Sequence, residues 1–112
     1  MNRDQAFAAL RQRGVAKAVV SFSGGNDEGG VNDITLLDAS GETLQHDLPT
    51  YTYGKEGEDV ALSEALGEPV YDQYGSFSGE FDVDGEVIWG VETREVRMSK
   101  EETEWVHSEE VV

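Results

Sequence analysis

The chain has 112 residues, and its 24 acidic side chains against 8 basic ones give a formal net charge of −16 at pH 7. A field of this sign repels nucleic acids and anionic membrane surfaces and attracts cationic surfaces. The sequence lacks cysteine, a membrane-length apolar run and an export signal, so we expect a single cytoplasmic domain over residues 1–112.

A helix is predicted first, over residues 2–13, because apolar side chains there recur on one stripe among arginines and glutamines. Asn2 is suited to cap the start of this helix, and Gly14 is suited to end it. The next segment, residues 15–23, is rich in β-branched residues and predicts a strand with Phe22 on its apolar face.

The glycine-rich segment at residues 23–30, SGGNDEGG, predicts a flexible loop, because glycine and turn-forming polar residues do not hold regular structure easily. A second strand is expected over residues 31–39. Residues 42–48 are then expected to return beside it as a hairpin partner.

Residues 58–74 change to the hydrophobic period of a helix, with leucine, valine and tyrosine recurring every four residues. This apolar stripe is suited to covering a sheet. Gly67 and Pro69 interrupt the stripe, and proline in a helix interior costs about 3 kcal/mol. We therefore expect a break or kink near Gly67.

The stretch from Gly75 to Lys100 alternates apolar and polar residues, which is typical of half-buried strands. Asp84 and Gly85 predict a hairpin turn inside it, because both residue types tolerate positive φ angles. A two-residue loop would place acids opposite apolar residues. We therefore expect a three-residue bulged loop, which pairs Phe81 with Trp89.

A second turn is expected over residues 92–95, setting Trp89 beside Met98. Residues 99–112 form an acidic C-terminal segment that is either an edge strand or a loosely docked tail. Together the elements predict an α+β domain with an antiparallel sheet of about five or six strands and two helices packed on one face.

Acidic residues occupy the polar positions of these strands, and alternate residues of a strand share one face of the sheet. The acids therefore gather on one face, although two like charges at ~5 Å repel by roughly 0.8 kcal/mol even in water. This clustering favours a surface that binds a basic partner. The candidate partner-binding residues are Glu80, Asp82, Glu86 and Glu92 in this stretch and Asp27 and Glu28 in the glycine-rich segment.

The sequence predicts no catalytic, cofactor or metal site. The NDEGG and DVDG segments carry carboxylates that would suit calcium, but neither has the ligand spacing of an EF-hand loop. The glycine-rich segment lacks the lysine of a phosphate-binding motif, and its acids would repel phosphate. The two histidines, His46 and His107, lie in no nucleophile motif, so we expect a protein that is not an enzyme.

Two blocks of the sequence carry a family resemblance: a strand ending in phenylalanine before a glycine-rich segment with aspartate, and a Tyr-Gly-Ser-Phe run leading into Gly-Glu-Phe. Over roughly residues 6–98 the chain resembles a family of small uncharacterised acidic proteins of bacteria and their mobile elements. The resemblance implies this fold and a bacterial or phage origin, and it carries over no catalytic residue. The matching residues are Phe22, Gly24, Gly25, Asp27, Gly29 and Gly30 in the first block and Tyr74, Gly75, Gly79, Glu80 and Phe81 in the second.

Three functions are compatible with these observations, and the clustered charge favours the first. It is nucleic-acid mimicry, in which the acidic face blocks a bacterial DNA- or RNA-binding defence protein of the CRISPR or restriction type. The second is a protein-interaction domain of a mobile element that docks through an apolar patch of Ile88, Tyr51, Tyr53 and Trp105. The third is an acidic domain whose charge serves only solubility. A helix or tail covering Ile88 would move the binding surface to the loops and the sheet edge.

Overall fold

The fold consists of helices on a curved sheet, and the computed structural model describes residues 1–25, 28–74, 82–102 and 106–112 of it. The elements in these residues are α1 (Arg3–Gln12), β1 (Lys17–Gly25), β2 (Glu28–Leu37), β3 (Thr43–Leu44), α2 (Glu58–Tyr74), β4 (Asp82–Gly90), β5 (Glu95–Glu102) and β6 (Val106–Val111).

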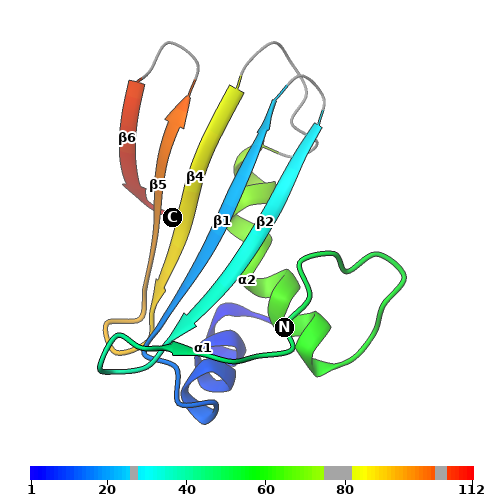
Figure 1. The fold of residues 1–112 in the computed structure, drawn as a ribbon, viewed down its shortest axis with the longest axis vertical. Coiled ribbons are helices and arrows are strands. Elements are labelled where there is room, and N and C mark those ends of the chain that lie inside the picture. The colour runs from blue at the N-terminus through cyan, green and yellow to red at the C-terminus, as the bar shows by residue number, and fades with distance from the viewer. Residues whose placement is uncertain (26–27, 75–81, 103–105) are drawn as a thin grey trace.

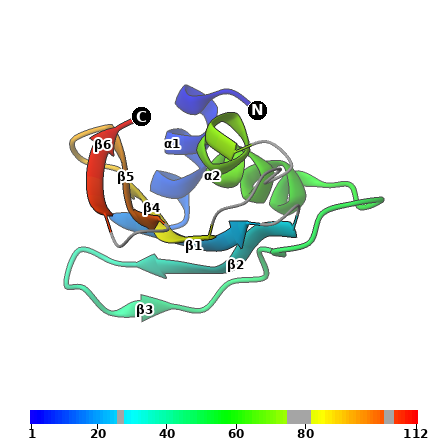
Figure 2. The ribbon, with the colours of Figure 1, turned by 90° about the horizontal axis from the view of Figure 1, so that it is seen from above.

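The strands form one antiparallel sheet in the order β3-β2-β1-β4-β5-β6, of which Figure 1 labels β2, β1, β4, β5 and β6 side by side and Figure 2 also labels β3. The predicted α+β fold with an antiparallel sheet of five or six strands is confirmed. β6 pairs with β5 at one margin of the sheet. The acidic C-terminal segment therefore contributes an edge strand rather than a loose tail.

α1 confirms the predicted first helix, including both of its ends. Asn2 Oδ1 accepts a hydrogen bond from the Gln5 backbone N–H at 2.8 Å, and Gln5 Oε1 accepts one from the Asn2 N–H at 2.9 Å. These reciprocal bonds satisfy two amides that the start of a helix leaves without partners. Gly14, just after the helix, has φ of 75°, a left-handed conformation that favours glycine.

Both helices lie on the same side of the sheet in Figure 2, within the curve that the strands make. We call this side the inner face and the opposite side the outer face. The rings of Phe7 in α1 and Trp89 in β4 lie 5.2 Å apart, and Trp89 Nε1 donates a hydrogen bond to the Leu66 carbonyl of α2 at 3.1 Å. Further along α2, Tyr74 lies 5.8 Å from the ring of Phe22. Trp89 thus ties β4 to both helices.

β4 runs straight through Asp84 and Gly85, so the hairpin predicted there is wrong. Its register with β1 is continuous and places Gly85 opposite Phe22. A Cβ atom on Gly85 would lie 2.7 Å from Phe22 Cζ and 2.6 Å from the Ser99 carbonyl oxygen. Glycine is required here for close packing and not for a turn. The partner strand expected over residues 77–81 lies outside the described residues.

The second turn is confirmed, but it spans residues 91–94 and its register differs from the prediction. Trp89 lies opposite Val96 rather than Met98, and its other neighbour comes from β1 rather than from Phe81. A shift of two positions keeps every residue on its face of the sheet. Trp89 therefore lies on the buried face of β4 in either register, and it is 1% exposed.

The segment predicted as a loop over residues 23–30 is largely strand. β1 continues to Gly25 and β2 begins at Glu28, and the two pair antiparallel up to these residues. The hairpin partner expected over residues 42–48 is confirmed only for the short strand Thr43–Leu44.

α2 is continuous from Glu58 to Tyr74 although Pro69 lies inside it, so the break predicted near Gly67 is wrong, and the alternative of a kink there stays a prediction. Leu62, Leu66 and Val70 are all 0% exposed, so this helix buries a full apolar stripe against the sheet. Tertiary packing of this kind outweighs the local preference of single residues.

Candidate functional site

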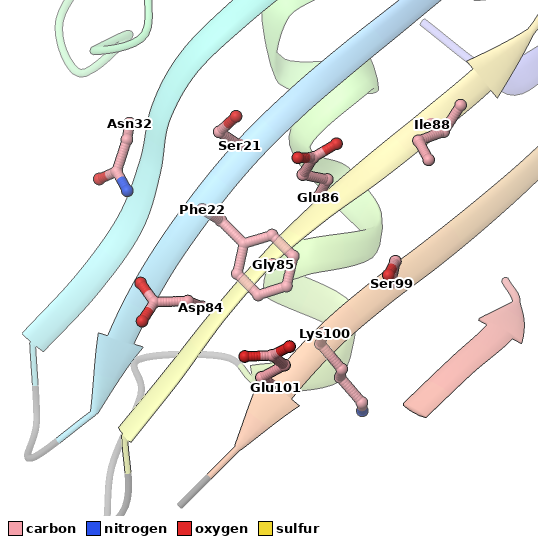
Figure 3. Close-up of a pocket in the computed structure, with 10 residues that line it drawn as sticks. All are labelled: Ser21, Phe22, Asn32, Asp84, Gly85, Glu86, Ile88, Ser99, Lys100 and Glu101. Carbon is pink, nitrogen blue, oxygen red and sulfur yellow. The ribbon is translucent and has the colours of Figure 1, made fainter. Parts of the chain in front are cut away.

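The outer face of the sheet carries the acidic residues of β4. Successive residues of a strand point to opposite faces, so the register that buries Val87 and Trp89 turns Asp84, Glu86 and Ile88 outward. Figure 3 shows these three side chains on the near side of the sheet, with α2 behind it. The acids therefore lie on the face that does not carry the helices.

Two rows of facing residues, made of serines and acids, cross the outer face from strand to strand. The rows are Asp33-Ser21-Glu86-Ser99 and Ser23-Asp84-Glu101. Serines flank Glu86 on both sides, whereas Asp84 and Glu101 face each other directly. Like charges in directly opposed positions destabilise a sheet. We call the exposed residues Asp33, Asp82, Asp84, Glu86 and Glu101 the acidic cluster.

A shallow hollow of about 430 Å³ opens over this cluster (Figure 3). Asp84, Glu86 and Glu101 contribute to its rim. The base among its described lining residues is Lys100, which is only 7% exposed and whose Nζ lies 5.2 Å from the ring of Tyr74 in α2. The charge that the hollow presents to a partner is therefore negative.

No described element covers the outer face. α1 and α2 lie on the inner side in Figure 2, and β6 continues the sheet beside β5. Ile88 lies between Val19 of β1 and Arg97 of β5 and is half-buried. Over the described residues, the surface around Ile88 is open, and the acidic cluster is exposed to solvent.

Three of the predicted site residues lie in or beside the acidic cluster. Asp82 and Glu86 are exposed on β4. Glu28 is exposed at the start of β2, and the register places it in one row with Gly25 and Asp82. These residues come from two strands that β1 separates, so the sheet brings them together.

Glu92 is not part of this group. It lies in the turn after β4, roughly 30 Å from the start of that strand by the rise per residue. There it lines a second hollow of about 250 Å³ together with Lys17, Glu95 and Arg97, so the hollow carries both signs of charge, and Arg97 forms an ion pair with Glu95 at 3.0 Å. The other two predicted site residues, Asp27 and Glu80, lie outside the described residues.

The sequence prediction leaves out three members of the cluster, Asp33, Asp84 and Glu101. It places Asp84 in a turn and Glu101 in the terminal segment, so their facing arrangement on β4 and β5 is unexpected. A signal for Asp84 exists, because Asp82, Asp84 and Glu86 keep a period of two through Gly85. No local pattern predicts the facing of Asp84 and Glu101, because it depends on strand register.

The carboxylates and the His46 side chain of the described residues bear on metal binding and on histidine chemistry. Among them, no group of three or more histidine, aspartate or glutamate side chains is arranged to hold a metal ion. His46 uses both ring nitrogens: Nε2 lies 2.8 Å from the Ile34 carbonyl oxygen, and Nδ1 accepts from the Leu48 N–H at 3.1 Å. A carbonyl oxygen only accepts, so Nε2 carries the hydrogen. This histidine fastens the segment after β3 to β2.

Comparisons with family models, curated proteins and solved structures found no match to this chain. In the part of the chain that is described, no helix is both long and apolar enough to span a membrane. The resemblance to small acidic proteins of bacteria and mobile elements stays a prediction.

Proposed function

We propose that this protein is an acidic binding module that docks the outer face of its sheet on the nucleic-acid-binding surface of a bacterial defence protein. It would thereby exclude DNA or RNA from that surface, as an inhibitor of the anti-CRISPR or anti-restriction type. The observation that supports the proposal is the acidic cluster, which is exposed on a face that no described element covers.

The spacing of the carboxylates in the cluster gives a density of negative charge similar to that of a phosphate backbone, which favours mimicry. Alternate residues on a strand lie ~6.8 Å apart, about twice the ~3.4 Å axial rise per phosphate of one DNA strand. Neighbouring strands lie ~4.8 Å apart, so acids on different strands increase the density of negative charge across the sheet. Lysine and arginine side chains that neutralise phosphates on a nucleic acid would neutralise these carboxylates instead.

A second candidate function, docking through an apolar patch, is favoured by one observation. Tyr51 and Tyr53 are 66% and 83% exposed, and their rings lie 6.5 Å apart on the segment before α2. Exposed tyrosines are frequent anchors of protein interfaces. Trp105, which was expected in the same patch, lies outside the described residues.

Two double variants separate these candidates. Asp84→Lys with Glu86→Lys reverses charge inside the acidic cluster, and Glu68→Lys with Asp72→Lys makes the same change in net charge on exposed residues of α2. Each protein is immobilised and used to capture partners from a bacterial lysate. We expect the wild type and the α2 variant to capture one nucleic-acid-binding protein, and the cluster variant to lose it.

Equal capture by both variants would contradict the proposal, because the acidic cluster would then have no role that other surface charge cannot fill. Loss of capture on changing Tyr51 and Tyr53 to serine, with the cluster variant still active, would instead support the apolar patch.

A further inference from the structure

A further cavity, distinct from the two hollows described above, lies on the inner side of the sheet, between β2, α2 and the segment that follows β3. Its volume is about 200 Å³, and none of its lining residues belongs to the acidic cluster. Val31, Ile34 and Pro49 give it apolar walls. α2 approaches β2 closely at this point, since a Cβ on Gly67 would lie 3.2 Å from Val31 Cγ2.

Ser63 gives this cavity an unpaired polar group. Its residue is 5% exposed, it lines the cavity, and its Oγ has no hydrogen-bond partner within the described structure. Buried hydroxyl groups nearly always have a partner, because an unmet one loses its hydrogen bonds to water without compensation. A polar group bound in the cavity would supply that partner.

The other polar groups of the cavity favour a positively charged ligand. Glu64 contributes an exposed carboxylate, and Thr50, Thr52 and Tyr71 contribute hydroxyl groups, of which the Tyr71 oxygen accepts a hydrogen bond from the Val31 N–H at 3.4 Å. An anion would meet Glu64 and the net charge of −16, and a purely apolar molecule would leave Ser63 unpaired. A primary ammonium has three donors and no acceptor, which suits one carboxylate and several hydroxyl oxygens.

We infer that this cavity binds a primary ammonium at the end of a short aliphatic chain, either a free alkylamine or a lysine side chain. The chain lies against the apolar walls, and the ammonium donates to Ser63 Oγ and the Glu64 carboxylate. The volume is below the ~300–1,000 Å³ of sites for drug-sized ligands, which restricts the ligand to a short chain. The inference is independent of the function proposed for the outer face.

Titration of the protein with n-butylammonium chloride, followed by amide NMR spectra, tests this site. We expect saturable shifts at the amides of residues 50–52, 63–68, 70 and 71, with a dissociation constant roughly in the millimolar range expected for so small a ligand. Potassium chloride at equal ionic strength is the control for salt. n-Butanol, which has the same chain without the charge, should bind at least about tenfold more weakly.

Blocked lysine, Nα-acetyl-lysine methylamide, separates the two sources of the ligand. Binding of both probes supports a lysine side chain as ligand, and binding of n-butylammonium alone supports a free amine. No saturable shift with either probe would overturn the inference. Equally tight binding of n-butanol would overturn it as well, because the charge would then play no part.

Two variants assign the contacts. Ser63→Ala and Glu64→Gln should each weaken n-butylammonium by about tenfold or more, because each removes an acceptor for a charged donor. Glu68→Gln, one helical turn further along α2, is the matched control and should bind like the wild type. Undiminished binding by both Ser63→Ala and Glu64→Gln would contradict the assignment. Glu64 is exposed, so its variant tests the site even where Ser63→Ala changes the fold.

Discussion

Gly85 shows that glycine can serve either in a turn or in close packing, and that the local sequence does not distinguish the two. Asp-Gly is a frequent turn pair, yet here the glycine lies in the middle of β4 opposite Phe22. The missing side chain leaves room for the Phe22 ring and for the Ser99 carbonyl of β5. Close packing across three strands, which no local pattern reports, therefore determines the residue at this position.

Gly85→Ala should lower the free energy of unfolding by about 1–3 kcal/mol, the usual cost of overpacking. The added methyl group would meet the Ser99 carbonyl oxygen at 2.6 Å, and a backbone atom of a central strand cannot move aside freely. Urea denaturation measures the change, with Ser99→Ala on the outer face as a control that should stay within about 0.5 kcal/mol. A Gly85→Ala variant as stable as the wild type would contradict the packing described for β4.

Asp38 organises the turn between β2 and β3. Its Oδ1 accepts hydrogen bonds from the Ser40 hydroxyl at 2.7 Å, the Ser40 N–H at 2.9 Å and the Glu42 N–H at 3.0 Å. These bonds favour the charged form of the carboxyl group, the Ser40 hydroxyl most of all, and they lower the pKa of Asp38 below its ordinary value.

The lowered pKa gives Asp38 a defined effect on the pH dependence of stability. The unfolded chain binds a proton at this residue at about pH 4, whereas the folded protein keeps the charged form to lower pH. The stabilisation is therefore present above that pH and is lost as the pH falls through the folded pKa. We expect Asp38→Ala to melt below the wild type at pH 7, and this difference to close under acid conditions. A difference in melting temperature that is independent of pH would contradict this role.

Helices and strands can be predicted from the sequence where nearby residues determine them. α1 has a cap at Asn2, its capping partner Gln5 and a stop at Gly14, all within or beside the helix. The strand faces also follow, because they need only a period of two. Other features depend on neighbours that are distant in sequence and could not be predicted locally. They are the extent of β1 and β2, the register of β4 with β5 and the continuity of α2 through Pro69.

The candidate site divides in the same way. Asp82 and Glu86 are predictable as members of one face, because both alternate with buried residues of the same strand. Their association with Glu28 and Glu101 depends on strand pairings across the sheet. Glu92 continues the same alternation in the sequence as Asp82 and Glu86. It is not part of the group because β4 ends before it.

Trp89 is the residue through which β4 holds both helices, so its truncation tests the packing of these elements. It is 1% exposed, contacts Phe7 of α1 and bonds to Leu66 of α2. Trp89→Ala should lower the free energy of unfolding by about 3–5 kcal/mol. Ile88→Ala, one position along on the outer face, should cost only about 1 kcal/mol. Similar costs for the two variants in a denaturation experiment would contradict the assignment of the faces of β4.

On the scale of the whole molecule, charge is distributed unevenly along the long axis. Most bases lie at the end where α1 meets the turn between β4 and β5 (Figure 1), and the acidic cluster lies toward the other end. Arg13 pairs there with Asp59 at 2.5 Å, and Arg94 pairs with Asp4. The bases of this end are Arg3, Arg11, Arg13, Lys17, Arg94 and Arg97, six of the 8 in the chain.

This separation makes the charge of the molecule asymmetric along its long axis. One end mixes both signs of charge, and the other presents the acidic cluster on a molecule 40 Å long. A basic groove would attract the acidic end first, so charge would orient the protein before contact as well as hold it afterwards. The outer face would then meet the partner with the helices turned away.

The most direct test of the proposed function is competition between this protein and nucleic acid for the captured partner. The partner is saturated with a fluorescently labelled DNA or RNA duplex, the protein is added, and the anisotropy of the label is followed. We predict that the wild type and the Glu68→Lys, Asp72→Lys variant release the duplex, whereas the Asp84→Lys, Glu86→Lys variant leaves it bound. A complex in which the partner holds the wild-type protein and the duplex at the same time would contradict the account.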